Sequence, residues 1–254
     1  MATTETTGSG DITRSMELLW GGAERPPRGR KPGLTLDRIV TAAVRLADTE
    51  GIAAVSMRRL SQELGAGTMS LYRYVPGKAE LLDLMLDHVQ APSADATAFE
   101  GGWRAALEMY ARATLDSYRA HPWLLQVNQA RPVLGPSAMA GLELMLGLIR
   151  PMGLRDPELI SVLIMVEGYV TGAARTQVHA AQAAQDTQLS DEDFWQAQMP
   201  FLERVMADGR YPLVAGLSED AFGWGFDHFE FGLQRVLDGL DVLVERRAAE
   251  RDGA

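Results

Sequence analysis

The stretch LGAGTMSLYRYVPGK, residues 64–78, decides the fold of the N-terminal part of this chain. A helix in this stretch begins after the Gly-Ala-Gly turn and ends about two turns later, at Pro76-Gly77. Such a short helix is not stable by itself in water. It offers a protein core only Leu71 and Val75, whereas its other side chains are Thr, Met, Ser, Tyr, Arg and Tyr. This composition predicts a helix that its neighbours hold in place and whose outer face is free to meet a partner.

The neighbouring sequence predicts the helices that support this short helix. Apolar residues recur at helical spacing over residues 36–50, 57–64 and 78–89. Thr35 and Ser56 are the expected N-caps of the first two helices. A helix, a tight turn with glycine and a second short helix form a helix-turn-helix, whose second helix lies in the major groove of DNA. The residues therefore predict a DNA-binding unit with a short recognition helix.

Length and composition set the broad class. The 254 residues, 46% of them hydrophobic and 23% charged, suffice for one large domain or for a small domain and a larger one. The chain has no cysteine, which excludes disulfides and thiol chemistry and fits a cytoplasmic location. No apolar run approaches the roughly 20 residues of a membrane helix, so we expect no membrane partner. The polar N-terminus does not have the pattern of a signal peptide.

The distribution of charge is uneven. The chain carries a net charge of −10, which by itself argues against nucleic acid as a partner. Residues 25–78, however, hold ten basic and four acidic residues, a net charge of +6, and the remainder therefore carries −16. A basic front part on an acidic body predicts two functions, one of which faces a polyanion.

The second half of the chain also has helical periodicity throughout, without a useful strand pattern or an internal repeat. We expect helices near residues 102–121, 122–129, 136–152, 157–184, 191–207 and 219–247. The predicted fold class is all-α, with an N-terminal three-helix helix-turn-helix domain followed by a helical domain for ligand binding and dimerisation. The expected boundaries are 1–33 for a flexible extension with a basic arm, 34–80 for the DNA-binding domain and 81–250 for the second domain.

Three segments differ in composition from the sequence around them. Residues 15–21 (SMELLWG) are an apolar exception in the extension and fit a short docked helix. Residues 182–190 are polar and fit a mobile loop. The first half of the helix expected from residue 157 is apolar nearly all round, which predicts a central position.

The last predicted helix carries a heptad seam, a row of apolar residues at heptad spacing that needs another helix packed against it. Its residues are Phe222, Phe226, Phe229, Leu233, Val236, Leu240 and Leu243. The seam satisfies this need either inside its own domain or at a subunit interface, where it and the helix from residue 157 pair with their copies in a four-helix bundle. We assign residues 222–240 of the seam to dimerisation.

The run LDRIVTAAVRLADTEGIAAVSMRRLSQELGAGTMSLYRYVPGKAELLDLMLDHV, residues 36–89, resembles the DNA-binding domain of the tetracycline-repressor family of bacterial regulators. The second half resembles the C-terminal domain of the tetracycline-repressor subfamily in four stretches, HPWLLQV, ARPVLGP, VEGYVTGAA and FEFGLQRVLDGL. The resemblance implies a ligand-responsive transcription regulator without enzymatic activity. It further implies a repressor that binds a palindromic, double-stranded DNA operator as a homodimer and is released by a small-molecule effector.

Chemistry and this resemblance together assign the DNA contacts. Residues at the tip of the short helix are expected at base edges, and Arg73 is expected at a guanine or a phosphate. The resemblance places Arg58 at a base. Tyrosine hydroxyls and helix starts are expected at phosphates. A basic arm in the extension fits the minor groove. The expected DNA-binding residues are Arg28, Arg30, Lys31, Thr35, Arg58, Thr68, Met69, Ser70, Tyr72, Arg73, Tyr74 and Lys78. Alternatively, either tyrosine is partly core, the arm is only a soluble tail, and Arg59 is a solvated or ion-paired arginine.

The effector site is expected among apolar and aromatic residues with a few polar groups. The candidates are Trp103, Met109, Tyr110, Trp123, Gln126, Met145, Met165, Glu167, Tyr169 and Thr176. For each of them plain core packing is the alternative. Glu167 is the most informative candidate, because a carboxylate in so apolar a helix is costly unless it is paired. It would meet a cationic ligand or an arginine such as Arg131 or Arg175.

The sequence predicts neither a metal nor a cofactor. Where the tetracycline repressor holds its magnesium-bound drug, QVNQARP has no histidine, and the position expected for a carboxylate falls at Thr176 or Gln177. The four histidines, at positions 88, 121, 179 and 228, make no metal spacing. Two other functions stay open, an all-helical enzyme without a recognisable motif and a constitutive helix-turn-helix factor with no effector.

Overall fold

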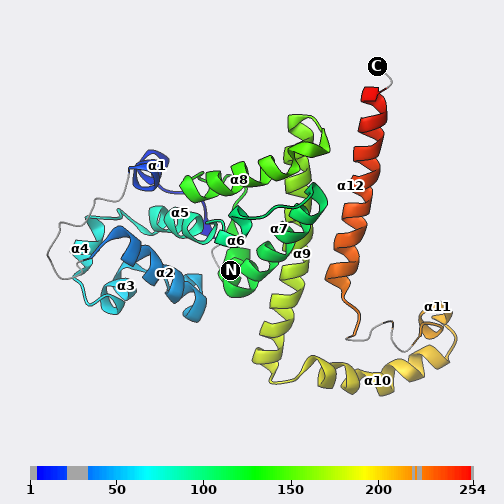
Figure 1. The fold of residues 1–254 in the computed structure, drawn as a ribbon. Coiled ribbons are helices and arrows are strands. Elements are labelled where there is room, and N and C mark those ends of the chain that lie inside the picture. The colour runs from blue at the N-terminus through cyan, green and yellow to red at the C-terminus, as the bar shows by residue number, and fades with distance from the viewer. Residues whose placement is uncertain (1–4, 22–33, 219–220, 222–224, 253–254) are drawn as a thin grey trace.

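The computed structural model describes residues 5–21, 34–218, 221 and 225–252. Over these ranges the chain is all-α apart from β1 (Glu5–Thr6) and β2 (Val127–Asn128), which pair in parallel. Figure 1 shows a group of small helices at one side, long helices at the other, and α5 leading from the first group to the second. The predicted fold class is therefore confirmed.

Local sequence signals determine the ends of the helices in the predicted helix-turn-helix unit. These elements are α2 (Leu36–Glu50), η1 (Ile52–Ala54), α3 (Met57–Glu63), α4 (Thr68–Tyr72) and α5 (Lys78–Val89). The Thr35 hydroxyl accepts a hydrogen bond from the backbone N–H of Arg38, and the Ser56 hydroxyl accepts one from that of Arg59, each at 3.2 Å. Gly51 ends α2 with a φ of 82°, a conformation that favours glycine. Both predicted N-caps are confirmed.

The recognition helix α4 is only five residues long. Leu71 in α4 and Val75 just after it are fully buried, whereas Met69 is 77% exposed. Because α4 packs against α3, the neighbouring helices provide the stability that so short a helix lacks. The prediction of a short, externally supported helix is confirmed.

The N-terminal segment differs from the expectation of a flexible extension over residues 1–33. Its residues 5–21 form β1 and α1 (Ile12–Trp20), and α1 packs on α5. The helix predicted around residues 15–21 is confirmed, although it begins three residues earlier. Residues 22–33, with the basic arm, lie outside the described residues.

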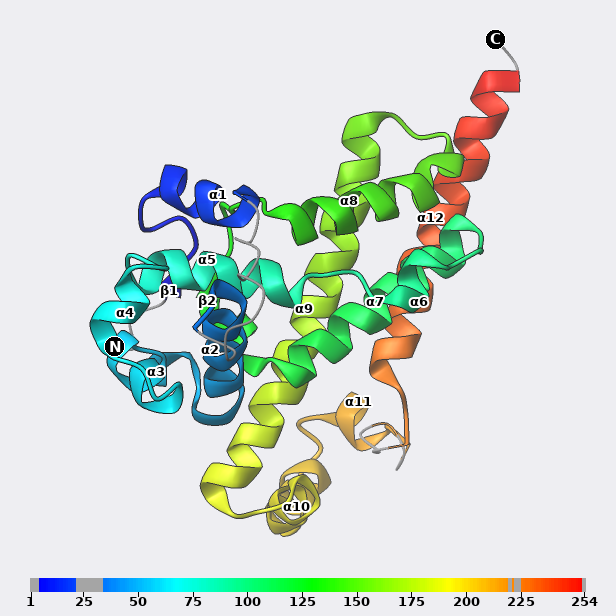
Figure 2. The ribbon, with the colours of Figure 1, turned by 60° about the vertical axis from the view of Figure 1, so that its left-hand side comes forward.

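Long helices build the second domain. They and their short connectors are α6 (Ala94–Thr97), α7 (Trp103–Ala120), η2 (Pro122–Gln126), α8 (Pro136–Ile149), η3 (Arg150–Met152), α9 (Asp156–Thr187), α10 (Asp191–Ala207), α11 (Pro212–Ala215) and α12 (His228–Asp252). Figures 1 and 2 show α7 crossing α9, with α12 alongside α9 and α10 projecting away. The loop predicted over residues 182–190 is wrong up to Thr187, which is still helical, and the last helix begins at His228 rather than near residue 219.

The heptad seam lies mostly inside its own chain, which corrects its assignment to dimerisation. Three members, Phe229, Leu233 and Leu240, are buried against the domain's own core, and Val236 is partly buried there. Phe226 precedes α12 and is exposed, and Phe222 lies outside the described residues. Heptad spacing shows that a face needs a partner helix but not which one; here α7 and α9 of the same chain supply it.

Helix α9 is central, as its apolar sequence predicts. It has 32 residues, and its most apolar window of 18 residues has a mean hydropathy of 1.2, enough by length and composition to cross a membrane. The expectation that no apolar stretch reaches this length is therefore wrong. Its buried valines, Val162, Val166 and Val170, pack within the helical domain, so the apolar sequence has a core to fill.

We expect Leu71→Ala to lower the free energy of unfolding by about 2–5 kcal/mol, because it removes apolar contacts and leaves a cavity under the recognition helix. Urea denaturation followed by circular dichroism measures the loss. Met69→Ala in the same helix is the control, and we expect it to change stability by no more than about 0.5 kcal/mol because its side chain faces solvent. Equal losses in both variants would contradict the anchoring role of Leu71.

Candidate nucleic-acid interface and effector site

The outer face of α4 is accessible where the sequence predicts base contacts. Met69, Ser70 and Arg73 are exposed. Thr68 is half-buried, and its hydroxyl donates a hydrogen bond to Ser61 Oγ at 3.1 Å. The helix thus presents an apolar side chain, hydroxyls and a guanidinium, which match the chemistry of base edges and phosphates.

The arginines of this region fall into two kinds. Arg58 and Arg73 are exposed, and neither has an ion-pair partner in the part of the chain that the structure describes. Arg59 lies between two carboxylates, 2.6 Å from Glu50 and 3.2 Å from Glu63, which raise its pKa. The expectation that Arg59 is ion-paired is confirmed, and the two unpaired guanidiniums are the ones available to DNA.

The predicted phosphate ligands surround this face. Tyr72 is exposed, whereas Tyr74 is half-buried and packs against the core. Lys78, at the start of α5, donates a hydrogen bond to the carbonyl of Ile52 at 3.3 Å and pairs with Glu5 at 2.8 Å. The predicted arm residues Arg28, Arg30 and Lys31 lie outside the described residues.

A polar cluster lies inside the second domain around Glu167. Tyr110 and Tyr118 of α7 donate hydrogen bonds to its carboxylate at 2.7 and 2.8 Å, and Thr171 is 3.1 Å from the Tyr118 hydroxyl. Burial, followed by the negative charge of Glu167, raises the pKa of both tyrosines, so both stay protonated donors. Within the described chain Glu167 has no ion pair, and neither predicted arginine neutralises it.

Sequence reasoning missed two members of this cluster, Tyr118 and Thr171. A signal was present, because Tyr118 lies eight residues after Tyr110 and Thr171 lies four after Glu167, and such spacings share one face of a helix. Tyr110 and Glu167 are the only predicted effector residues in the described structure whose side chains hydrogen-bond to each other.

The other predicted effector residues are dispersed. Three of them, Trp103, Met109 and Met145, pack in or against the core. Another three, Gln126, Met165 and Thr176, are exposed. Tyr169 stacks on Phe229 and donates to its carbonyl at 2.7 Å, which ties α9 to α12. Trp123 is buried and donates to Asp48 at 2.7 Å, so it joins the two domains. No side-chain hydrogen bond joins any of these eight residues to Glu167 in the described part of the chain.

An open groove of about 220 Å³ lies between α7, α9 and the start of α12. Its lining is polar and includes Arg112, Asp116, Arg119, Gln177, Asp227 and Glu230. None of the predicted effector residues belongs to this lining.

Comparison with known proteins gives independent matches for both halves of the chain. Residues 39–85 match the family described as bacterial regulatory proteins, tetR family, and residues 97–244 match the tetracyclin repressor-like C-terminal domain. The chain belongs to the tetracycline-repressor family. It is a DNA-binding transcription regulator, not an enzyme.

Several relatives of this family member are characterised by name or structure. It is 65% identical over 248 residues, 97% of this chain and 92% of the relative, to the HTH-type transcriptional repressor DrrR1 of Streptomyces coeruleorubidus. A crystal structure of ActR from Streptomyces coelicolor in complex with (S)-DNPA has a TM-score of 0.55 and 30% identity, covering 84% of this chain and 99% of that one. A further ActR structure contains actinorhodin, with a TM-score of 0.57 and 29% identity over 84% and 99% of the two chains.

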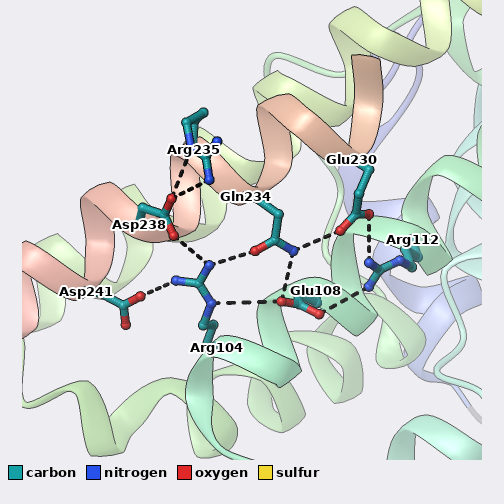
Figure 3. Close-up of polar contacts among 8 residues, drawn as sticks. All are labelled: Arg104, Glu108, Arg112, Glu230, Gln234, Arg235, Asp238 and Asp241. Carbon is teal, nitrogen blue, oxygen red and sulfur yellow. Dashed lines mark hydrogen bonds and ion pairs between the residues drawn. The ribbon is translucent and has the colours of Figure 1, made fainter. Parts of the chain in front are cut away.

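An ion-pair network fixes α12 of this regulator to α7 (Figure 3). Arg104 contacts Asp238 at 2.8 Å, Gln234 at 2.7 Å and, more closely, Asp241. Arg112 extends the network to Glu230 at 2.7 Å. Several shared acceptors hold one guanidinium in a defined place, so the network positions the two helices more firmly than an isolated surface pair would.

We expect Arg104→Gln to lower the free energy of unfolding by about 1–2 kcal/mol, because it leaves the acidic side of α12 without its central cation. Urea denaturation measures the loss. Arg150→Gln is the control, because Arg150 forms an exposed ion pair with Asp156 only, so its removal has a negligible expected cost. A similar loss in both variants would contradict the positioning role of the network.

Proposed function

We propose that this regulator binds a palindromic operator as a homodimer and leaves it when a small molecule binds the second domain. The observation that carries this proposal is the exposed face of α4 beside the unpaired guanidiniums of Arg58 and Arg73, held by the buried Leu71. A repressor name for a relative with 65% identity supports repression as the mode of action.

Each side chain has a proposed role at the duplex. Thr68, Met69 and Ser70 contact base edges, Arg58 contacts a base, and Arg73 contacts a guanine or a phosphate. Tyr72, Tyr74, Lys78 and the start of α2 at Thr35 bind phosphates, which position the protein without reading the sequence. The arm residues Arg28, Arg30 and Lys31 enter the minor groove.

The proposed subunit interface uses the outward faces of α9 and α12 rather than the buried seam. Ile160 and Ile164 lie one turn apart on α9, and Phe231 and Val242 lie eleven residues apart, on one face of α12. All four are exposed in the single chain. Apolar side chains at this density on paired helices favour a four-helix interface between two copies.

The proposed effector site is the Glu167 cluster. The carboxylate accepts two phenolic hydroxyls, so an effector with a hydrogen-bond donor or a positive charge would replace one of them. Trp103, Met109 and Met145, which pack in or against the hydrophobic core, are the proposed apolar part of the lining. The complexes of ActR with (S)-DNPA and actinorhodin support a small organic effector. We retain 34–80 as the proposed DNA-binding domain and 81–250 as the proposed effector domain.

We expect Arg58→Ala to reduce the preference for a fragment selected from genomic DNA over a random duplex by about 1–3 kcal/mol, because one base contact is lost. Fluorescence anisotropy with both duplexes measures the preference. Arg59→Ala is the matched control, since Glu50 and Glu63 already neutralise Arg59. An unchanged preference in Arg58→Ala would refute the base-reading role.

We expect a dimer by multi-angle light scattering at micromolar concentration and a monomer for Ile164→Glu, because the interface would bury an unpaired charge. Met139→Glu in α8 changes an exposed apolar residue outside this face, and we expect it to remain a dimer. A monomeric unmodified chain would refute the homodimer, and a dimeric Ile164→Glu variant would refute this interface.

A further inference from the structure

The N-terminal segment 5–21 is bound to the effector domain by its first residues. In the parallel ladder Glu5 pairs with Val127 and Thr6 with Asn128. The backbone N–H of Thr7 donates to the Asn128 carbonyl at 3.1 Å, and its hydroxyl donates to the Arg131 carbonyl at 2.8 Å. These bonds tie Glu5 to residues 127–131, the connection between α7 and α8, so the position of Glu5 depends on the position of that connection.

The same segment also binds two buried carboxylates of α5. The backbone N–H of Gly8 donates to Asp83 at 2.9 Å, the buried Ser15 hydroxyl donates to the other oxygen of Asp83 at 2.7 Å, and the N–H of Asp11 donates to Glu80 at 2.9 Å. Asp83 is only 2% exposed, so undocking would take these donors from a carboxylate that is costly to leave unsatisfied. The docked state is therefore specific.

The fit is tight at Gly10. A Cβ atom at this position would lie 2.3 Å from a carboxylate oxygen of Glu80 and 2.9 Å from the Cβ of Ala79. The second of these atoms is fixed to the backbone of α5, so a larger residue at position 10 would push the segment away. This steric limit provides a way to loosen the segment without changing a charge.

The docked segment places a carboxylate on the proposed phosphate ligand of α5. Glu5 Oε1 lies 2.8 Å from Lys78 Nζ, and Lys78 is the first residue of the helix, where the partial positive charge of the N-terminus favours an anion. Glu5 therefore occupies the Lys78 ammonium group, which would otherwise be available to bind a DNA phosphate. An ion pair and a phosphate contact at one ammonium group compete.

We propose that β1 and α1 form a built-in competitor of DNA, in which Glu5 withholds Lys78 from the phosphate backbone. This inference rests on the proposed function. Because β1 pairs with β2 of the effector domain, a shift of the connection between α7 and α8 moves Glu5 relative to Lys78. Linkage is reciprocal: the factor by which the pair of Glu5 and Lys78 lowers the affinity for DNA equals the factor by which bound DNA lowers the stability of that pair.

The experiment measures the affinity for a random-sequence duplex by fluorescence anisotropy across a salt series around 150 mM, where the Debye length is about 8 Å. We expect Glu5→Gln to bind about two- to five-fold tighter, the fold-change expected from an exposed ion pair. The slope of log affinity against log salt should become steeper by about 0.9, one added phosphate contact. Glu17→Gln removes the same charge from α1, where Glu17 pairs with Arg14 only, and should bind like the unmodified chain.

Two further variants make the result specific. In a Lys78→Ala background, Glu5→Gln should no longer change affinity, and Gly10→Ala should reproduce the gain of Glu5→Gln in the otherwise unmodified chain. No gain in Glu5→Gln, or an equal gain with and without Lys78, overturns the competition. A failure of the unmodified chain to bind any duplex would instead overturn the proposed function, so the two failures are distinguishable.

Discussion

The burial of three carboxylates on α5 is the constraint on which the arrangement of the two domains depends. Glu80, Asp83 and Asp87 are buried together with the apolar residues of the same helix. Each needs donors, because an unsatisfied buried carboxylate costs more free energy than its contacts return. The N-terminal segment supplies donors to Glu80 and Asp83, and the first backbone N–H groups of α8, at Ser137 and Ala138, supply them to Asp87. These bonds hold α5, the helix that runs from the DNA-binding unit into the second domain, against the N-terminal segment and α8.

Sequence patterns predicted the DNA-binding half closely, because its signals are local. The caps at Thr35 and Ser56 act within one helical turn, and apolar spacing identified Leu71 and Val75 as the anchors of α4. The acidic residues of α5 gave no comparable signal. A carboxylate such as Asp83 normally marks a solvated face, and its donors at Gly8 and Ser15 lie 75 and 68 residues away in the sequence.

The candidate site residues show the same difference between positions that local sequence signals identify and positions that depend on distant contacts. The exposed face of α4 was predictable, because a side chain that the core does not need must point outward. The effector residues could not be predicted in this way, because an aromatic or methionine side chain fills a core and lines a pocket equally well. Only Glu167 carried information, since its charge demanded partners, and even there the partners proved to be Tyr110 and Tyr118 rather than an arginine.

Two further contacts join the DNA-binding helices to the second domain, and both meet at Asp48. Asp48 of α2 accepts a hydrogen bond from Trp123 Nε1 at 2.7 Å and lies 2.7 Å from His121 Nδ1, at the end of α7. In the proposed mechanism of release, a movement of α7 would act on α2 through Asp48 and on Lys78 through β2 and Glu5. In a symmetric dimer both subunits would make this movement, which doubles the change in separation between two recognition helices. A small local shift would then suffice to break their match to half-sites about one helical turn apart.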